Sequence, residues 1–288
     1  MTLPDVQSER PEFPLRLGRV GIVGLLVPSG PFRDGSLVLQ DVRLDAFVDL
    51  PGGQRGIHSS RTYEAVFRFL EGLNGRVELD SAVLGLAREV LGHHDYAGSA
   101  EVVIRARAYD VAVSPMTSKP SYRWSRVRAA ARVSRAGTAS KSLQVSTLGI
   151  TACPCAKRVV QAMWGEERDL TATHMQRTLG RIGLVYRADE SVRAERVLEV
   201  LRRSFSSQVL DLLKRPDEAR VVVDAVKNPL FIEDSVRHAV KSLVGAFPHL
   251  SDDDLLEVEM RSVESIHSYD MVARFSGTLL EARSLPDP

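Results

Sequence analysis

The chain has 288 residues, of which 44% are hydrophobic and 26% are charged, a composition typical of a globular protein with a sizeable core. Its 38 lysines and arginines nearly balance 37 aspartates and glutamates, so net charge gives no general attraction to nucleic acid or to an anionic membrane. No apolar run is long enough to span a bilayer, and residues 1–16 lack the apolar core of a signal peptide; we therefore expect a cytoplasmic protein with no nucleic-acid or membrane partner.

The first half of the chain predicts two strands, two helices and two more strands. Apolar, partly alternating residues predict the strands, and the helices show apolar residues at helical spacing after a serine or an aspartate cap. A Pro/Gly-rich segment separates the first two strands, which favours an antiparallel pair. In chain order the expected elements are strands at 17–27 and 36–49, helices at 59–73 and 80–92, and strands at 100–114 and 122–135.

The second half repeats this order, with an insertion at 153–172 between its first two strands. The expected elements are strands at 140–151 and 173–188, helices at 191–213, 217–226 and 231–247, and strands at 255–266 and 269–282. Two tandem ββααββ units, 17–138 and 139–288, after an N-terminal extension at 1–16, define an α+β architecture. Because each unit leaves sheet edges unpaired, we expect subunits to join edge to edge into a ring or barrel.

Potential metal ligands are concentrated in the second half. The only two cysteines are two residues apart on one segment, which is poor geometry for a disulfide, and thiols in a reducing compartment more often serve metals or catalysis. Thiolate, imidazole and carboxylate together are the ligand set of a catalytic zinc or a similar divalent ion. The residues concerned are Cys153, Cys155, His174, Glu218, Glu264 and His267.

Each of these residues also allows a structural role. Cys155 precedes an amphipathic segment and can pack as a small hydrophobe. Glu218 and Glu233 stand where a first helical turn is expected, a position in which the helix dipole stabilises a carboxylate. Glu264 and His267 flank a turn and can be solvated. Spacing alone therefore leaves the metal site and these structural roles open.

Seven strings point to one family and span nearly the whole chain. They occur in the same order in GTP cyclohydrolases of type IB, which are prokaryotic and metal-dependent, and in their archaeal relatives. TACPCA and THMQR resemble the archaeal branch, which makes a cyclic phosphate of dihydroneopterin, more than the common bacterial branch. The strings are LPDVQ at 3–7, GIHSSR at 56–61, GITACPCA at 149–156, THMQR at 173–177, LLKRPDE at 212–218, NPLFIED at 228–234 and ESIH at 264–267.

The resemblance implies the tunnelling fold, in which ββααββ units assemble into barrels, and this agrees with the element order above. It implies a homotetramer with GTP sites at subunit interfaces and one divalent ion, Zn, Fe(II) or Mn, in each site. The implied reaction hydrolyses the imidazole ring of guanine, releases formate and yields a 7,8-dihydroneopterin phosphate, either the triphosphate or the 2',3'-cyclic phosphate, for folate or methanopterin-type pterin synthesis. A divalent ion suits this reaction because it makes hydroxide available near neutral pH.

The resemblance also implies roles for individual residues. The metal ligands are Cys153, also the catalytic thiolate, with Cys155 as the second choice, and Glu218, Glu264 and His267. His174 acts in acid/base transfer, Glu233 anchors guanine, Arg177 and Lys214 contact the triphosphate, and His58 and Arg61 reach phosphate across an interface. One position departs from the common pattern: Tyr269 stands where many members carry a second histidine.

Three other classes of function compete with this interpretation. A non-catalytic purine- or pterin-binding protein of the same fold would keep Glu233 but have no use for the full ligand set. A pterin synthase or a nitrile reductase of the tunnelling fold would share the glutamate anchor, but those enzymes carry different local strings. A scaffold protein would not concentrate cysteine, histidine and glutamate in one half.

Overall fold

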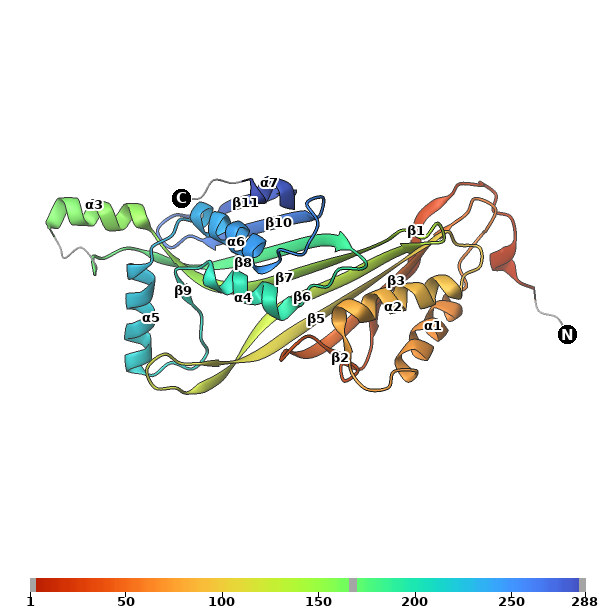
Figure 1. Ribbon diagram of the computed structural model, residues 1–288, viewed down its shortest axis with the longest axis horizontal. Helices are drawn as coiled ribbons and strands as arrows, with labels where there is room; N and C mark the ends of the chain where they lie inside the picture. The colour runs from red at the N-terminus through yellow and green to blue at the C-terminus, as the bar shows by residue number, and fades with distance from the viewer. Residues whose placement is uncertain (1–3, 166–169, 285–288) are drawn as a thin grey trace. The chain divides into compact units, whose positions relative to one another are not determined.

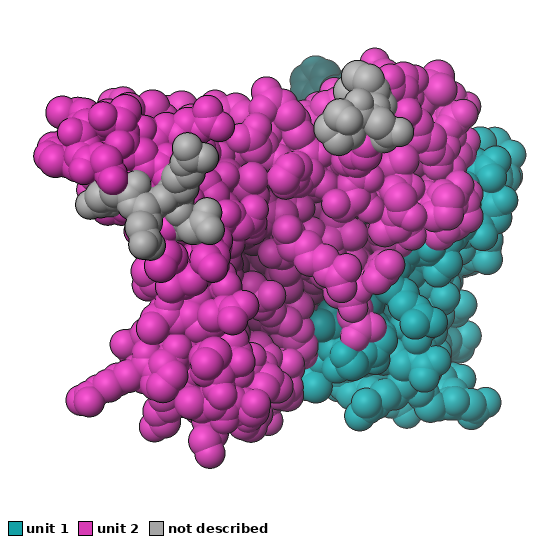
Figure 2. Space-filling model, turned by 60° about the vertical axis from the view of Figure 1, so that its left-hand side comes forward, with its two compact units in different colours: residues 1–107, 128–143, 186–193 teal, residues 108–127, 144–185, 194–288 magenta. Residues whose placement is uncertain are grey.

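The computed structural model describes residues 4–165 and 170–284. Leu3 of the LPDVQ string and residues 166–169 of the insertion lie outside the described residues. The chain divides into two compact units, coloured separately in Figure 2. Unit 1 comprises residues 1–107, 128–143 and 186–193, and unit 2 comprises residues 108–127, 144–185 and 194–288. The division of the chain into tandem units at 17–138 and 139–288 concerns repeated element order and stays a prediction.

The strands form a hydrogen-bonded series in the order β1-β3-β5-β6-β7-β8-β10-β11, and β9 pairs with β7. β10 pairs antiparallel with both β8 and β11, and β1 pairs antiparallel with β3. β7 shows the expected period of two, because every second side chain is buried. The bounds are β1 Leu17–Leu26, β2 Phe32–Arg33, β3 Val38–Leu50, β4 Val77–Glu78, β5 Ser99–Val113, β6 Pro120–Ser134, β7 Ala139–Ala152, β8 Met175–Arg187, β9 Ser207–Gln208, β10 Leu255–Val263 and β11 Met271–Thr278.

Unit 1 packs two neighbouring helices, α1 (Ser59–Glu71) and α2 (Leu79–Gly92), with its strands (Figure 1). A short 3-10 helix, η1 (Val6–Ser8), precedes β1, and β2 and β4 form a small parallel pair. A charged cluster lies inside this unit: Lys141 Nζ is 2.6 Å from Asp80 Oδ2, and the Tyr186 hydroxyl donates to the same carboxylate. Both charged residues are buried, and each is tolerated there because it forms an ion pair with the other.

Unit 2 holds the remaining helices: α3 Pro154–Trp164, α4 Ala194–Arg203, α5 Arg215–Lys227, α6 Ile232–Ala246 and α7 Leu279–Arg283. α4 and α6 lie side by side, and α6 covers β10 and β11 (Figure 1). Wholly buried side chains such as Leu198, Leu243 and Met260 form the core between these layers. α3 differs from the other α-helices because none of its residues is buried.

The predicted order of strands and helices is confirmed in both halves. The helix predicted over 191–213 is wrong beyond Arg203. Serines follow there, and serine side chains compete with helical backbone hydrogen bonds. The hydroxyl of Ser206 accepts from the backbone of Ala152 and of Leu230, and the chain then pairs as β9 with β7.

The strand predicted over 269–282 ends earlier, at Thr278. Thr278 and Glu281 form a reciprocal capping box that begins α7. Within the insertion, Cys153 caps α3 and Pro154 occupies its first position, where proline is favoured. In the described part of the chain, no helix has the length and apolar character to cross a membrane.

Candidate functional site

A pocket of about 280 Å³ in unit 2 brings five of the sequence-predicted residues together. They come from different elements: the end of β7, the start of β8, the first turn of α6, and the segment after β10. The five are Cys153, His174, Glu233, Glu264 and His267.

Cys153 is held at the junction of β7 and α3 by backbone hydrogen bonds. Its N–H donates to the carbonyl of His174 at 3.1 Å, and the Thr173 hydroxyl donates to its carbonyl at 2.6 Å. Its Sγ accepts from the backbone N–H of Ala156 at 3.4 Å, which makes Cys153 the N-cap of α3. The thiol therefore has a defined position beside the first residues of the β8 region.

A hydrogen-bond chain connects His174 to Glu264 through Gln176. His174 Nδ1 is 3.0 Å from Gln176 Oε1, and Gln176 Nε2 donates to Glu264 Oε1 at 3.3 Å. Ser262 Oγ donates to the same carboxylate oxygen at 2.5 Å. Because Gln176 Oε1 only accepts, the proton of a neutral His174 stands on Nδ1, which leaves Nε2 as an acceptor. Gln176 was not among the predicted site residues, although its spacing of two from His174 on an expected strand places both on one face.

The Tyr269 ring lies against the pocket residue His267. The two rings are stacked, with centroids 5.0 Å apart and planes inclined by 6°. Both side chains are exposed. Tyr269 thus provides a flat surface that orients the imidazole of His267.

The segments that carry Cys153 and Glu233 are tied together by Ser206. Ser206 Oγ accepts from the N–H of Ala152 at 3.1 Å and from the N–H of Leu230 at 3.2 Å. Ala152 directly precedes Cys153, and Leu230 lies just before α6. No sequence signal identified Ser206, because its partners lie far away in the chain.

The other predicted residues lie outside the pocket lining in the described chain. Cys155 is exposed on α3, and Arg177 lines a different hollow. Lys214 and Glu218 stand at the start of α5, where their neighbour Asp217 is buried and accepts from the backbone of the β5–β6 turn. His58 and Arg61 belong to unit 1.

The pocket offers the donor types of a divalent-metal site, namely thiol, imidazole and carboxylate. Among residues 4–165 and 170–284, however, no three side chains of His, Cys, Asp or Glu are grouped so that they could hold an ion. The donor chemistry therefore fits a metal, while the arrangement within one chain does not complete its coordination.

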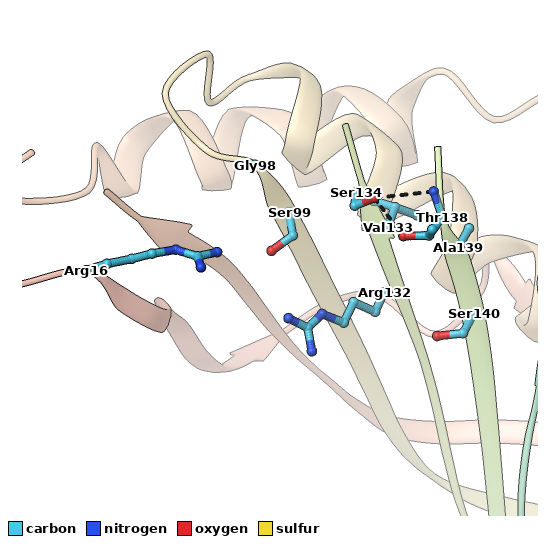
Figure 3. A pocket seen from close by; sticks show the side chains of 9 residues that line it. All are labelled: Arg16, Gly98, Ser99, Arg132, Val133, Ser134, Thr138, Ala139 and Ser140. Atoms are coloured by element: carbon cyan, nitrogen blue, oxygen red, sulfur yellow. Dashed lines mark hydrogen bonds between the residues drawn. The ribbon is translucent and has the colours of Figure 1, made fainter. Parts of the chain in front are cut away.

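A larger hollow of about 410 Å³ lies in unit 1. Arg16 and Arg132 point into the same space near Ser99 (Figure 3), and Arg16 is already paired with Asp49 at 2.8 Å. The residues described along it include no thiol, imidazole or carboxylate. Because acid/base and metal chemistry need such groups, the smaller pocket is the better candidate for a reaction site.

Solved structures with a similar fold include uricases. The uricase of Arthrobacter globiformis matches with a TM-score of 0.54 at 9% identity over 91% of this chain and 94% of that chain. The uricase of Bacillus fastidious matches with a TM-score of 0.53 at 12% identity over 93% and 97%. At such low identity the likeness shows the fold alone, and it confirms the predicted tunnelling-fold class.

The family follows from sequence matches over nearly the whole chain. Residues 3–273 match the family described as "Type I GTP cyclohydrolase folE2". "GTP cyclohydrolase MptA" of Methanothermobacter thermautotrophicus is 35% identical over 97% of this chain and 95% of that protein. The protein with the same name from Aeropyrum pernix is 35% identical over 98% of both chains. The chain therefore belongs to the type I GTP cyclohydrolase family, which confirms the predicted family and enzyme class.

Proposed function

We propose that the pocket at Cys153, His174 and Glu233 opens the imidazole ring of GTP, releases formate and yields a 7,8-dihydroneopterin phosphate for pterin synthesis. One observation carries this proposal: a thiol, an imidazole and a carboxylate from separate elements meet in one pocket of a type I GTP cyclohydrolase chain. In this reaction one water adds at carbon 8 of guanine and cleaves one carbon–nitrogen bond, which leaves a formamide. A second water hydrolyses the formamide to formate, and the ribose carbons then close the pterin ring with loss of one water.

Glu233 is proposed to select guanine. The guanine edge presents two adjacent donors, N1–H and the 2-amino group, and one carboxylate can accept from both. Glu233 lines the pocket, and its side chain is exposed with space beside it for a base. Adenine lacks this pair of donors, so a site built around the carboxylate discriminates against ATP.

His174 is proposed to move protons between water and the ring nitrogens. Its Nδ1 faces Gln176 Oε1 at 3.0 Å, so Nε2 is the nitrogen that exchanges protons. The chain of hydrogen bonds onward to Glu264 holds the imidazole ring in this orientation. Gln176 is therefore part of the proposed proton-transfer apparatus although it does not itself titrate.

Cys153, Glu218, Glu264 and His267 are proposed to hold one divalent ion, Zn, Fe(II) or Mn. When bound, such an ion supplies hydroxide near neutral pH and polarises the bond under attack. Three of the four residues line the pocket; Glu218 stands on α5 outside its lining. We expect the coordination to close when the ion binds or when subunits assemble, and the metal content of the purified protein, measured before and after chelation, tests this directly.

The triphosphate of bound GTP is proposed to extend out of the pocket and to contact cationic side chains outside its lining. No lysine or arginine lines the pocket in the described chain, yet a triphosphate needs cationic partners. We propose Lys214 from the same chain and His58 and Arg61 from a neighbouring subunit as these partners. The family strings assign Arg177 to the triphosphate as well; it lines a separate hollow, so this contact stays a prediction.

We propose a homotetramer with sites shared between subunits, because the described chain leaves strand edges and apolar side chains uncovered. β1 and β11 end the strand series and leave free edges in the described chain, and edges of this kind seek a partner strand. α3 also exposes apolar side chains, among them Val159, Met163 and Trp164. Contacts with other copies of the chain would pair these strand edges and remove the apolar side chains of α3 from water.

Incubation of the anaerobic, metal-loaded protein with GTP tests the proposed function. One formate per GTP and a dihydroneopterin phosphate are expected, and the product mass separates the triphosphate from the 2',3'-cyclic phosphate. Recovery of intact GTP together with tight GTP binding would instead favour the non-catalytic purine-binding protein.

A further inference from the structure

A second hollow, of about 240 Å³, lies in unit 2 on β6, β7, β8 and the segment after β9. We name it the aromatic hollow, after Tyr122 and Trp124 in its lining; Leu148, Arg177 and Asp211 also line it. Successive residues of a strand point to opposite faces. On β8, Gln176 lines the reaction pocket and the next residue, Arg177, lines the aromatic hollow. The two cavities are therefore distinct and lie on opposite sides of this strand.

The aromatic hollow gathers two exposed aromatic side chains and two exposed charged side chains in one place. Trp124 is 42% exposed and Tyr122 is 69% exposed. Within residues 4–165 and 170–284, the side chains of Arg177 and Asp211 make no hydrogen bond or ion pair. Two aromatic rings, two arginines, of which Arg123 is already paired with Asp110, and a carboxylate surround this hollow. Such groups recognise a flat, phosphate-bearing heterocycle.

The frame of the aromatic hollow is held in place without a ligand. Arg123 donates to Asp110 at 2.8 Å and to Gln208 Oε1 at 2.8 Å, which ties the start of β6 to the segment that leads to Asp211. Asp110 also accepts from Arg202 at 2.6 Å. Burial raises the pKa of Asp110, but the hydrogen bond from Arg123 and the charge of Arg202 outweigh burial and leave that pKa below its usual value. The Asp110 carboxylate thus stays charged at neutral pH and keeps its hydrogen bonds to Arg123 and Arg202.

We propose that the aromatic hollow binds a phosphate-bearing ring with a 2-amino-4-oxopyrimidine edge, the edge that guanine and pterins share. Trp124 and Tyr122 stack on the ring, Asp211 accepts from the ring N–H and the amino group, and Arg177 binds phosphate. The choice of ligand rests on the proposed function, because the substrate GTP and the dihydroneopterin phosphate product both carry this edge. The enzyme thereby has a binding site for its own substrate or product outside the reaction pocket.

The chain's tryptophan content allows a direct test. It has two tryptophans, Trp124 and Trp164, and Trp164 ends α3 away from the hollow lining. In the full-length Trp164→Phe protein, fluorescence reports on Trp124 alone. The Glu233→Gln substitution is added to weaken binding in the reaction pocket. GTP, ATP and neopterin monophosphate are then titrated separately, and the first and last distinguish a substrate site from a product site.

We expect GTP or neopterin monophosphate to quench Trp124 at concentrations at least tenfold lower than ATP does. Asp211→Asn should remove this preference, and Arg177→Ala should weaken binding at least tenfold. Arg181→Ala is the matched control: it lies four residues along the same strand, on the same face, and pairs with Glu259 at 3.7 Å. It should leave the quenching curve unchanged.

Two results would overturn the proposal. One is the absence of quenching by all three ligands. The other is quenching by GTP that is present with Glu233 intact and lost in Glu233→Gln, because Trp124 would then report the reaction pocket. Formate release is measured on the Trp164→Phe protein that retains Glu233. Quenching without formate release refutes the proposed function and leaves the second site standing, whereas formate release without quenching does the reverse.

Discussion

Replacing Ser206 with alanine tests how the two halves of the reaction pocket are held together. Ser206 is only 5% exposed. Its hydroxyl accepts from the N–H groups of Ala152 and Leu230 at 3.1 and 3.2 Å. Ser206→Ala leaves both amides buried without a partner. Each unsatisfied buried amide costs about 1 to 3 kcal/mol, so we expect a loss of about 3 kcal/mol in the free energy of unfolding. For a chain of this size that corresponds to a fall of about 6 to 12 °C in Tm.

Calorimetry and steady-state kinetics on the same preparation separate stability from positioning. The matched control is Ser204→Ala: Ser204 is 1% exposed, and its hydroxyl donates to the carbonyl of Val200 at 3.0 Å. It contacts neither segment of the pocket, so a loss of about 1 kcal/mol with unchanged kcat is expected. Ser206→Ala should also lower kcat, because Cys153 and Glu233 lose their common anchor. Equal Tm shifts in both variants, with unchanged kinetics, would refute this role of Ser206.

Three further predictions concern recognition, pH and assembly. Glu233→Gln should raise the KM for GTP by roughly tenfold to a hundredfold, about 1 to 3 kcal/mol, and reduce the preference for GTP over ATP; unchanged values of both would count against the guanine anchor. Burial lowers the pKa of His94 from 6.5 to about 4, so the unfolded chain takes up the proton first and stability should fall as pH drops from 6.5 to 4. A Tm series in His94→Gln should show a flatter slope across that window, and an unchanged slope would exclude His94 as its cause. Inactive His58→Ala and Cys153→Ala chains, refolded together, should regain partial activity if sites are shared between subunits; mixed oligomers without activity would place both groups in one chain.

The fold was predictable where a local pattern suffices. The alternation in β7 and the helical spacing in α2 are properties of neighbouring residues, so both elements appear at the expected places. The helix predicted over 191–213 failed because apolar spacing continues past Arg203, while the competing hydrogen bonds of Ser206 come from residues far away in the chain. The buried pair of Lys141 and Asp80 was hidden for the same reason: each charge is tolerable only beside the other.

The candidate site was predictable through family strings rather than through spacing. Cys153, His174 and Glu233 are far apart in the sequence, and only the fold brings them to one pocket. Gln176 follows from strand periodicity once His174 is known. Glu218 illustrates the remaining gap, because its placement outside the pocket lining makes its proposed role depend on a metal or on a second subunit.

The central claim is that the pocket around Cys153 is where GTP is opened, and the two cysteines provide the most direct measurement of it. Cys153 lines the pocket, whereas Cys155, two residues later, is exposed on α3. Formate release from GTP and bound metal are measured for Cys153→Ala and Cys155→Ala in parallel under anaerobic conditions. We predict that Cys153→Ala loses both tight metal binding and formate release, while Cys155→Ala retains them. Full turnover and stoichiometric metal in Cys153→Ala would contradict the assignment of this pocket as the reaction site.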